Sequence, residues 1–258
     1  MNQPECTLIK GTEDIQKKED QTITPEPPFV ITRYADMNAG NLIAEYVVGQ
    51  IINNERKFYH MWESQKKIVW DFQLYEYRQL NELTIGILGA GTLGSTVAKF
   101  LKQRDATVLG LVRSTHKTKK PDFDKVVTDI SEILPYCDYI CNILPSTPHT
   151  EGLLNGDVLK MCQKEPFFIN VGRGDIISEE DLINALNQGW ISGAALDVFI
   201  EEPLPTSSPL WNRPEVIITP HKASVLKPQN VAKFFVENYQ RFMTGKELMC
   251  KFSWTRKY

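Results

Sequence analysis

The sequence predicts an α/β fold built on a doubly wound parallel sheet, and two observations lead to this prediction. From residue 83 onward, short apolar runs alternate with segments of helical periodicity. A glycine-rich turn, GAGTLG, follows the first of these runs and leads into a helical segment. Strands separated by helices form right-handed βαβ units, and such units assemble into a parallel sheet covered by helices.

Seven apolar runs are predicted strands, because each is short, apolar and bounded by polar residues or glycine. They span residues 84–88, 107–112, 125–127, 139–144, 167–171, 193–198 and 216–219. Helices are predicted at 94–104, 131–136, 157–162 and 178–188, and a last helix at 229–244 closes the fold. The helix at 178–188 has marked ends: Ser178 and Asp181 have the spacing of a capping box, and Gly189 follows as a C-cap.

Residues 39–62 form a long helix candidate ahead of the sheet. Apolar residues recur along it at helical spacing, including Tyr46, Val47 and Ile51. Two interpretations of this stripe stay open. It faces the core, as in an ordinary amphipathic helix, or its dense apolar character marks a contact between two copies of a homodimer.

Composition excludes several classes of function. The 258 residues carry a net charge of −3, so no global basic field favours a nucleic-acid partner. No apolar run approaches the roughly 18 residues of a membrane helix, and the N-terminus has no apolar stretch typical of a secretory signal. The five cysteines are odd in number and scattered, which favours reduced thiols in a cytoplasmic protein.

The turn GAGTLG has the GxGxxG pattern between a strand and a helix, where a dinucleotide-binding fold requires it. Gly89 permits the tight turn, Gly91 lets the backbone approach a pyrophosphate, and Gly94 lets the helix pack on the strand. The helix N-terminus offers free N–H groups and partial positive charge to the phosphates. These features predict a Rossmann-type cofactor site.

The second strand indicates which cofactor this site prefers. An NAD site usually ends this strand in an acidic residue that binds the ribose 2′-hydroxyl. Here the strand is followed by RSTHKTKK, with no acidic residue. Arg113 can pair with a 2′-phosphate or stack on adenine, Ser114 can donate to the phosphate, and Lys117 adds charge. NADPH is therefore expected in preference to NADH, the alternative being that this run is simply a solvated basic loop.

Three further segments carry candidate catalytic residues. Arg173 ends a strand between two glycines, and a guanidinium there can hold a carboxylate and polarise the adjacent carbonyl. Asp197 lies at another strand end, from where it can reach the nicotinamide amide, and Glu202 follows it. His221 comes just after the last strand, where a nearby glutamate can orient it as a proton donor. The alternatives are a surface arginine in a tight turn and a structural histidine.

The motifs GILGAGTLG, NILPSTPHTEGLL, NVGRGDIISEEDL, ALDVFIEEPLP and PLWNRPEVIITPH occur in this order. Together they resemble the D-isomer-specific 2-hydroxyacid dehydrogenases, most of all the NADPH-preferring glyoxylate/hydroxypyruvate reductases. The resemblance implies that Arg173, Glu202 and His221 are the catalytic residues, acting on a small 2-oxoacid. It also implies further cofactor contacts at Thr92, Leu93, Leu144, Pro145, Thr150, Val171 and Asp197; no metal site is expected.

One element of that family is absent from the sequence. Its members have a second, substrate-side domain whose G-A-G-x-D loop binds the substrate carboxylate, but the only GAG here is that of the cofactor turn. The expected organisation is therefore a polar, weakly ordered leader (1–27), a remnant of the substrate domain with a linking helix (28–80), the NAD(P)-binding domain (81–223) and a C-terminal helix packing toward the substrate domain (224–258). Two functions stay open: an NADPH-dependent 2-oxoacid reductase, or a truncated, non-catalytic form that binds NADP(H) and a partner subunit.

Overall fold

The computed structural model describes residues 29–34, 37–72, 76–114 and 120–252. The chain divides into two compact units, one made of Asp36–Leu226 and the other of Met1–Ala35 with Lys227–Tyr258. The predicted leader at 1–27 lies outside the described residues. No helix among the described residues is both long enough and apolar enough to cross a bilayer.

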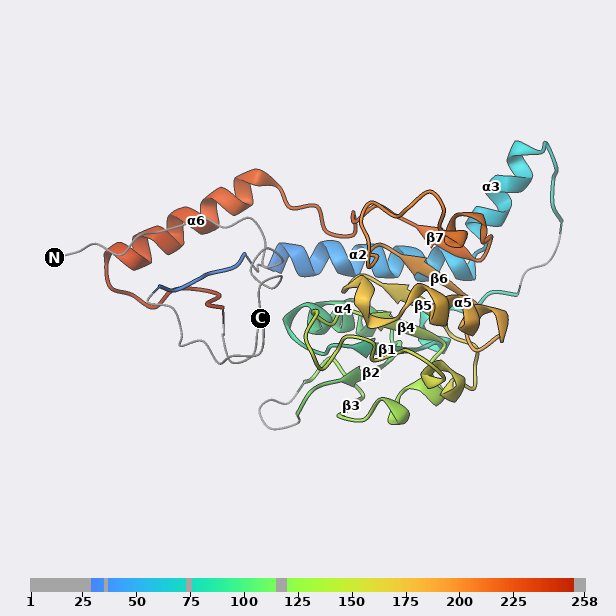
Figure 1. Cartoon of the computed structure of the whole chain (residues 1–258), viewed down its shortest axis with the longest axis horizontal. Coiled ribbons are helices and arrows are strands. Elements are labelled where there is room, and N and C mark those ends of the chain that lie inside the picture. Colours follow the sequence, from blue (N-terminus) through green and yellow to red (C-terminus); the bar gives the residue numbers. More distant parts are fainter. Residues whose placement is uncertain (1–28, 35–36, 73–75, 115–119, 253–258) are drawn as a thin grey trace. The chain divides into compact units, whose positions relative to one another are not determined.

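The larger unit is built on a seven-stranded sheet of order β3-β2-β1-β4-β5-β6-β7, in which every neighbouring pair is parallel (Figure 1). The predicted α/β fold is confirmed. The strands are β1 (Thr84–Leu88), β2 (Thr107–Leu111), β3 (Lys125–Val127), β4 (Tyr139–Asn142), β5 (Phe167–Asn170), β6 (Gly193–Leu196) and β7 (Val216–Ile218). All seven predicted runs are strands, and five of them end one or two residues earlier than predicted because their last residues leave the sheet as loops toward the site.

The order of the sheet fixes where a ligand can bind. The chain moves outward from β1 to β2 and β3, then returns to place β4 on the other side of β1. The strand order therefore reverses between β1 and β4, and in open α/β sheets ligands bind at the carboxyl ends of the strands that flank such a point. The central strands β4, β5 and β6 are buried along their whole length, which is why each is read as a continuous apolar run.

Two α-helices follow strands as predicted. α4 (Thr92–Lys102) begins two residues earlier than predicted, directly after Gly91, and α5 (Glu179–Asn187) begins after Ser178. The Ser178 hydroxyl oxygen accepts from the Asp181 N–H at 3.0 Å and its proton goes to the Asp181 carboxylate at 2.7 Å. The reciprocal bond of a capping box is replaced, because the Ser178 N–H donates to Asn155. Gly189 ends the helix with φ +68°, as its C-cap role requires.

The predicted helices at 131–136 and 157–162 were wrong in type, since both are short 3₁₀ turns. The first is two turns, η2 (Ile130–Glu132) and η3 (Leu134–Tyr136), and Pro135 lacks the N–H that a continuing α-helix needs. The second is η4 (Val158–Met161), too short for the cooperative growth of an α-helix. Three other 3₁₀ turns are η1 (Leu80–Glu82), η5 (Gly174–Ile176) and η6 (Pro209–Asn212).

The single helix predicted at 39–62 is two helices, α2 (Met37–Glu55) and α3 (Phe58–Lys66). Lys57 separates them because it takes a left-handed conformation, φ +54°, that an α-helix cannot contain. The last residue of α2, Glu55, is held by Arg78, whose guanidinium and backbone N–H both donate to its carboxylate. These hydrogen bonds fix the end of α2.

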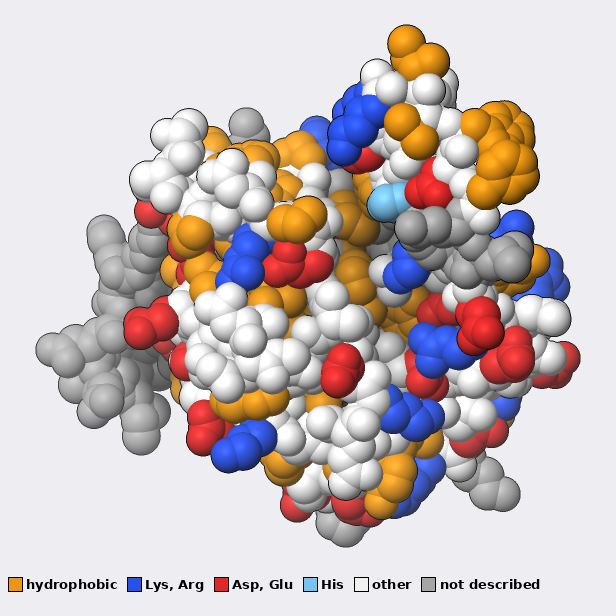
Figure 2. Space-filling model, turned by 90° about the vertical axis from the view of Figure 1, so that its right-hand side faces the viewer, with side chains coloured by type: hydrophobic (Ala, Val, Ile, Leu, Met, Phe, Trp, Pro, Cys, Tyr) orange, Lys and Arg blue, Asp and Glu red, His pale blue; other side chains and the backbone are white. Residues whose placement is uncertain are grey.

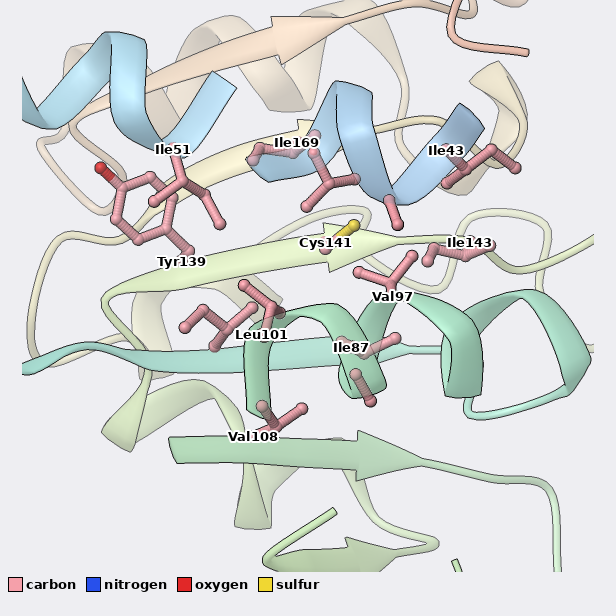
Figure 3. Packing of buried hydrophobic residues seen from close by; sticks show 14 of the residues in the cluster. Ile43, Ile51, Ile87, Val97, Leu101, Val108, Tyr139, Cys141, Ile143 and Ile169 are labelled. Carbon is pink, nitrogen blue, oxygen red and sulfur yellow. The ribbon is translucent and has the colours of Figure 1, made fainter. Parts of the chain in front are cut away.

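The apolar stripe of α2 faces the core of the larger unit. Ile43 and Ile51 lie against β4 and α4, beside Val97, Leu101 and Cys141 (Figure 3). The core-facing interpretation therefore holds for α2. α3, by contrast, has no buried residue.

The smaller unit contains α6 (Pro228–Met243), which confirms the last predicted helix with its start and end shifted by one residue. Thr32 pairs with Lys251 in an isolated antiparallel bridge, and the ring of Tyr34 meets that of Phe234 edge-on at 5.3 Å. The buried Asn238 side chain is bonded in both directions to the backbone of Met249. The Thr32–Lys251 bridge and the Tyr34–Phe234 contact join the two sequence segments of this unit.

Candidate active site

The carboxyl edge of the sheet gathers the loops that carry the candidate residues. Because all seven strands run the same way, the chain leaves each of them at this edge. The turn after β1, the loops after β2, β4 and β5, and the segments after β6 and β7 carry the predicted cofactor and catalytic residues.

The glycines of the turn have the properties that the GxGxxG pattern predicts. Gly89 has φ +108°, which a residue with a side chain rarely adopts. A Cβ on Gly94 would clash with the carbonyl oxygen of Gly89, so α4 packs on the turn only with glycine there. A Cβ on Gly91 would have no atom of the described residues within 4 Å. The space beside Gly91 is open at the N-terminus of α4, where no side chain caps the first N–H groups.

This open turn fits a dinucleotide phosphate. The uncapped N–H groups of Thr92, Leu93 and their neighbours supply donors, and the helix dipole favours an anion. Thr92 is exposed, whereas Leu93 packs partly against the core. Arg113 and Ser114 are both exposed directly beyond β2. Lys117 and the rest of residues 115–119 lie outside the described part of the chain.

The loop after β4 is fixed by its own hydrogen bonds. The Thr150 hydroxyl donates to the Pro145 carbonyl at 2.6 Å and accepts from the Thr147 N–H at 2.9 Å. Thr150 thus shapes the loop that carries Leu144 and Pro145. Val171, on the neighbouring loop, is buried.

Two buried asparagines, which sequence reasoning passed over, tie these loops together. Asn142 and Asn170 end the adjacent strands β4 and β5, and the Asn142 amide donates to the Asn170 side-chain oxygen at 2.9 Å. Asn142 also accepts from the Leu144 N–H at 3.1 Å, and Asn170 donates to the Arg173 carbonyl at 3.0 Å. Their position at the ends of apolar strands was the available signal, because a buried amide needs partners.

Arg173 is exposed at this edge. Its guanidinium makes a 2.8 Å hydrogen bond to the Gly172 carbonyl, and its backbone carbonyl is the one that Asn170 holds. The backbone of this residue is therefore fixed while the charged end of the side chain remains accessible to an anion.

His221 and Glu202 form a pair. The His221 Nδ1 lies 2.8 Å from Glu202 Oε2, and the other Glu202 oxygen accepts from the Phe199 N–H at 2.9 Å. A carboxylate only accepts, so Nδ1 carries a proton and Nε2 is the nitrogen left for chemistry. Both side chains are substantially exposed, at 51% for His221 and 36% for Glu202, so a ligand can reach them.

Asp197 is 1% exposed, and its carboxylate faces the turn that carries His221. It accepts from the backbone N–H groups of Lys222 at 2.7 Å and Ala223 at 2.8 Å, and from the Thr219 hydroxyl. The sequence predicted that this carboxylate binds the nicotinamide amide. In the structure three donors of the protein engage it.

The edge thus combines an anion-binding turn, a guanidinium and an imidazole oriented by a carboxylate. This set suits transfer of a hydride and a proton to the carbonyl group of a small acid, because the guanidinium binds the carboxylate and the imidazole supplies the proton.

Comparison with known proteins agrees with this chemistry. The model of the D-isomer specific 2-hydroxyacid dehydrogenase NAD-binding domain matches residues 48–223. A D-isomer specific 2-hydroxyacid dehydrogenase from Xanthobacter autotrophicus, solved with NADPH and MES, is 30% identical with a TM-score of 0.83, and the match covers 96% of this chain and 100% of that one. A family protein from Aeromonas salmonicida is 36% identical with a TM-score of 0.80, covering 88% and 73%.

A third solved relative is an NADPH-dependent glyoxylate/hydroxypyruvate reductase from Sinorhizobium meliloti, in complex with NADP and sulfate. It is 28% identical with a TM-score of 0.83, and the match covers 90% of this chain and 74% of that one. The chain belongs to the D-isomer specific 2-hydroxyacid dehydrogenases, a family of NAD(P)-dependent oxidoreductases, and contains the NAD-binding domain of that family.

Proposed function

We propose that the protein reduces a small 2-oxoacid, glyoxylate or hydroxypyruvate, to the 2-hydroxy acid with NADPH. The observation that carries this proposal is the 2.8 Å pair of His221 and Glu202 at the sheet edge that also presents Arg173 and the glycine turn. The Sinorhizobium meliloti relative, a glyoxylate/hydroxypyruvate reductase, supports the choice of substrate.

Each catalytic residue has a distinct role in this proposal. Bound NADPH supplies the hydride to the keto carbon. His221 gives the proton on Nε2 to the keto oxygen, and Glu202 keeps the imidazole oriented through Nδ1. Arg173 binds the substrate carboxylate and stabilises charge developing on the carbonyl oxygen.

The cofactor is held by the glycine turn and the N-terminus of α4, with Arg113 and Ser114 at the adenine-ribose end. These two exposed residues follow β2 in a run without an acidic side chain, so they suit a 2′-phosphate better than a 2′-hydroxyl. Leu144, Pro145, Thr150 and Val171 would lie along the cofactor. The open space beside Gly91 is the main support for this placement.

A paired assay tests the proposal. NADPH affinity is measured first by fluorescence titration, and NADPH oxidation is then followed with glyoxylate and with hydroxypyruvate. Micromolar NADPH binding and turnover with either acid are expected. Tight binding without turnover would contradict the reductase and favour the non-catalytic alternative, and absence of NADPH binding would contradict the cofactor site itself.

We also propose that residues 81–223 are the cofactor-binding domain and that the smaller unit, with α6, is part of the substrate-side domain. The smaller unit has its own contacts, Thr32 with Lys251 and Tyr34 with Phe234. Limited proteolysis should cut near residues 35 and 227, with NADPH protecting the cofactor domain alone.

A homodimer through the segment at 39–62 is proposed as well, with the contact on α3. Phe58, Tyr59, Met61 and Trp62 are each more than 40% exposed, and apolar side chains gather on the face that carries α3 (Figure 2). Sedimentation velocity of a Trp62→Arg variant should show a monomer, whereas Tyr136→Phe, a change at an exposed tyrosine outside α3, should leave the dimer intact.

We propose the cytoplasm as the location. Cys137, Cys141 and Cys162 are free thiols, as a reducing compartment would leave them. Burial raises the pKa of Cys137 and Cys162 to about 12, so neither is a reactive thiolate at neutral pH. Subcellular fractionation with antibodies against the protein tests this placement.

A further inference from the structure

Tyr46 on α2 reaches the turn that carries His221. The sequence assigned Tyr46 to the apolar stripe of its helix, and its ring does pack against the core. Its hydroxyl, however, lies 2.8 Å from Oγ1 of Thr219, a residue 173 positions later in the chain. Thr219 is the residue that follows β7, two before His221.

The direction of these hydrogen bonds follows from the protons available. A threonine hydroxyl has one proton, and Thr219 donates it to the Asp197 carboxylate, which can only accept. Tyr46 therefore donates to Thr219. Burial raises the pKa of Tyr46 to about 12, so the phenol keeps its proton at neutral pH. The bonds run one way, from Tyr46 through Thr219 to Asp197.

Asp197 fixes the turn on both sides of His221. Its carboxylate accepts from the N–H groups of Lys222 and Ala223, and its backbone carbonyl accepts from the His221 N–H at 2.9 Å. His221 itself has φ +52°, a conformation that a non-glycine residue adopts only where neighbouring contacts hold it. These contacts hold the backbone from which the imidazole reaches Glu202.

We propose that Tyr46 is a positioning residue for His221, acting through Thr219 and Asp197. This inference rests on the proposed function, in which His221 is the proton donor. Tyr46 anchors the oxygen of Thr219, Thr219 orients the Asp197 carboxylate, and that carboxylate holds the turn. Tyr46 thereby supports the turn of His221 from α2 without touching the substrate.

Tyr139 offers a matched control. It is also a tyrosine bonded to α2, since its hydroxyl donates to Glu55 and accepts from Asn54, each at 2.8 Å. It begins β4, so it lies at the amino edge of the sheet, opposite the edge that carries His221. A Tyr139→Phe variant loses a buried hydroxyl and stability, as Tyr46→Phe does, without touching the turn.

The experiment compares Tyr46→Phe, Thr219→Val, their double variant and Tyr139→Phe with the wild-type chain. Tyr46→Phe should lower kcat roughly fivefold to tenfold, the scale of one net hydrogen bond, while the Kd for NADPH changes by less than about twofold. Thr219→Val should lower kcat further than Tyr46→Phe does, and the kcat of the double variant should be no lower than that of Thr219→Val alone. Tyr139→Phe should leave kcat unchanged.

Hydrogen exchange supplies a readout that needs no turnover. In Tyr46→Phe the amides of Lys222 and Ala223 should exchange about fivefold faster or more, and in Tyr139→Phe they should exchange as in the wild type. If the wild type shows no activity, the proposed function fails and exchange alone judges the positioning role. Unchanged exchange in Tyr46→Phe, or equal changes in both variants, would overturn the inference.

Discussion

The sharpest prediction concerns the two glycines Gly91 and Gly94, whose different roles in the motif are matched by different surroundings in the structure. An alanine Cβ at residue 91 meets no atom within 4 Å in the part of the chain that the structure describes, and the backbone there, at φ −80° and ψ −158°, is accessible to alanine. An alanine at residue 94 clashes with the Gly89 carbonyl oxygen and lies 3.1 Å from the Gly89 carbonyl carbon and 3.2 Å from Ile87 Cγ2. Gly91→Ala should therefore spare the fold, and Gly94→Ala should not.

The magnitudes follow from these distances. Overpacking against a backbone carbonyl costs about 1–3 kcal/mol, because neither the turn nor the helix can yield without losing hydrogen bonds. For a domain of this size, each kcal/mol lowers Tm by about 2–4 °C, so Gly94→Ala should lower Tm by roughly 2–12 °C. Gly91→Ala should change Tm by less than about 2 °C. It should nevertheless weaken NADPH binding at least about tenfold, because its methyl group occupies the space proposed for the pyrophosphate.

Differential scanning fluorimetry and NADPH titration of both variants measure these two effects separately. Gly49→Ala serves as the control, since a Cβ at residue 49 also has open space and lies on α2, away from the turn. A Gly91→Ala variant that binds NADPH as tightly as the wild type would refute the phosphate-binding role of the turn. A large loss of Tm in Gly91→Ala would refute the open space on which the reasoning depends.

Three further predictions concern single side chains. Arg113→Ala should weaken NADPH binding at least about tenfold more than NADH binding in paired titrations. An equal loss of affinity for both cofactors would contradict the 2′-phosphate contact. His221→Gln should lower kcat roughly 10²- to 10⁴-fold with NADPH affinity retained, and a loss of affinity alone would contradict the role of proton donor. Burial would raise the pKa of Glu55, but the hydrogen bonds from Arg78 outweigh this effect, and the pKa lies below its ordinary value. The ionised Glu55 therefore stabilises the fold fully above the unfolded-state pKa, and this stabilisation is lost as pH falls through the folded-state pKa. Glu55→Gln should therefore lower the free energy of unfolding at pH 7 by about 1–2 kcal/mol, discounted because Arg78 is half exposed. In urea melts the difference from the wild type should begin to shrink as pH falls below the unfolded-state pKa of about 4.3 and should be lost below the folded-state pKa.

Local patterns were enough for the sheet and the glycine turn. A strand such as Phe167–Asn170 is buried on both faces, so its first three residues are all apolar, and the strand can be predicted without knowing its partners. The turn at Gly89 can also be predicted locally, because its positive φ depends on the absence of a side chain at that one residue. The ends of helices were harder to predict from the sequence. The break at Lys57 accompanies the hydrogen bonds between Arg78 and Glu55, which lie 23 residues apart in the chain.

The sequence by itself determined the fold class, the family and which residue types stand at the ends of the strands. Only the tertiary structure decided which of these residues meet: that His221 finds Glu202, that Asn142 pairs with Asn170, and that the Asp197 carboxylate faces the turn of His221. It also gave the hydroxyl of Tyr46 a partner that periodicity cannot identify. The physical reason is that apolar periodicity reports which face of an element is buried, whereas a hydrogen bond depends on which distant residue the packing brings within reach.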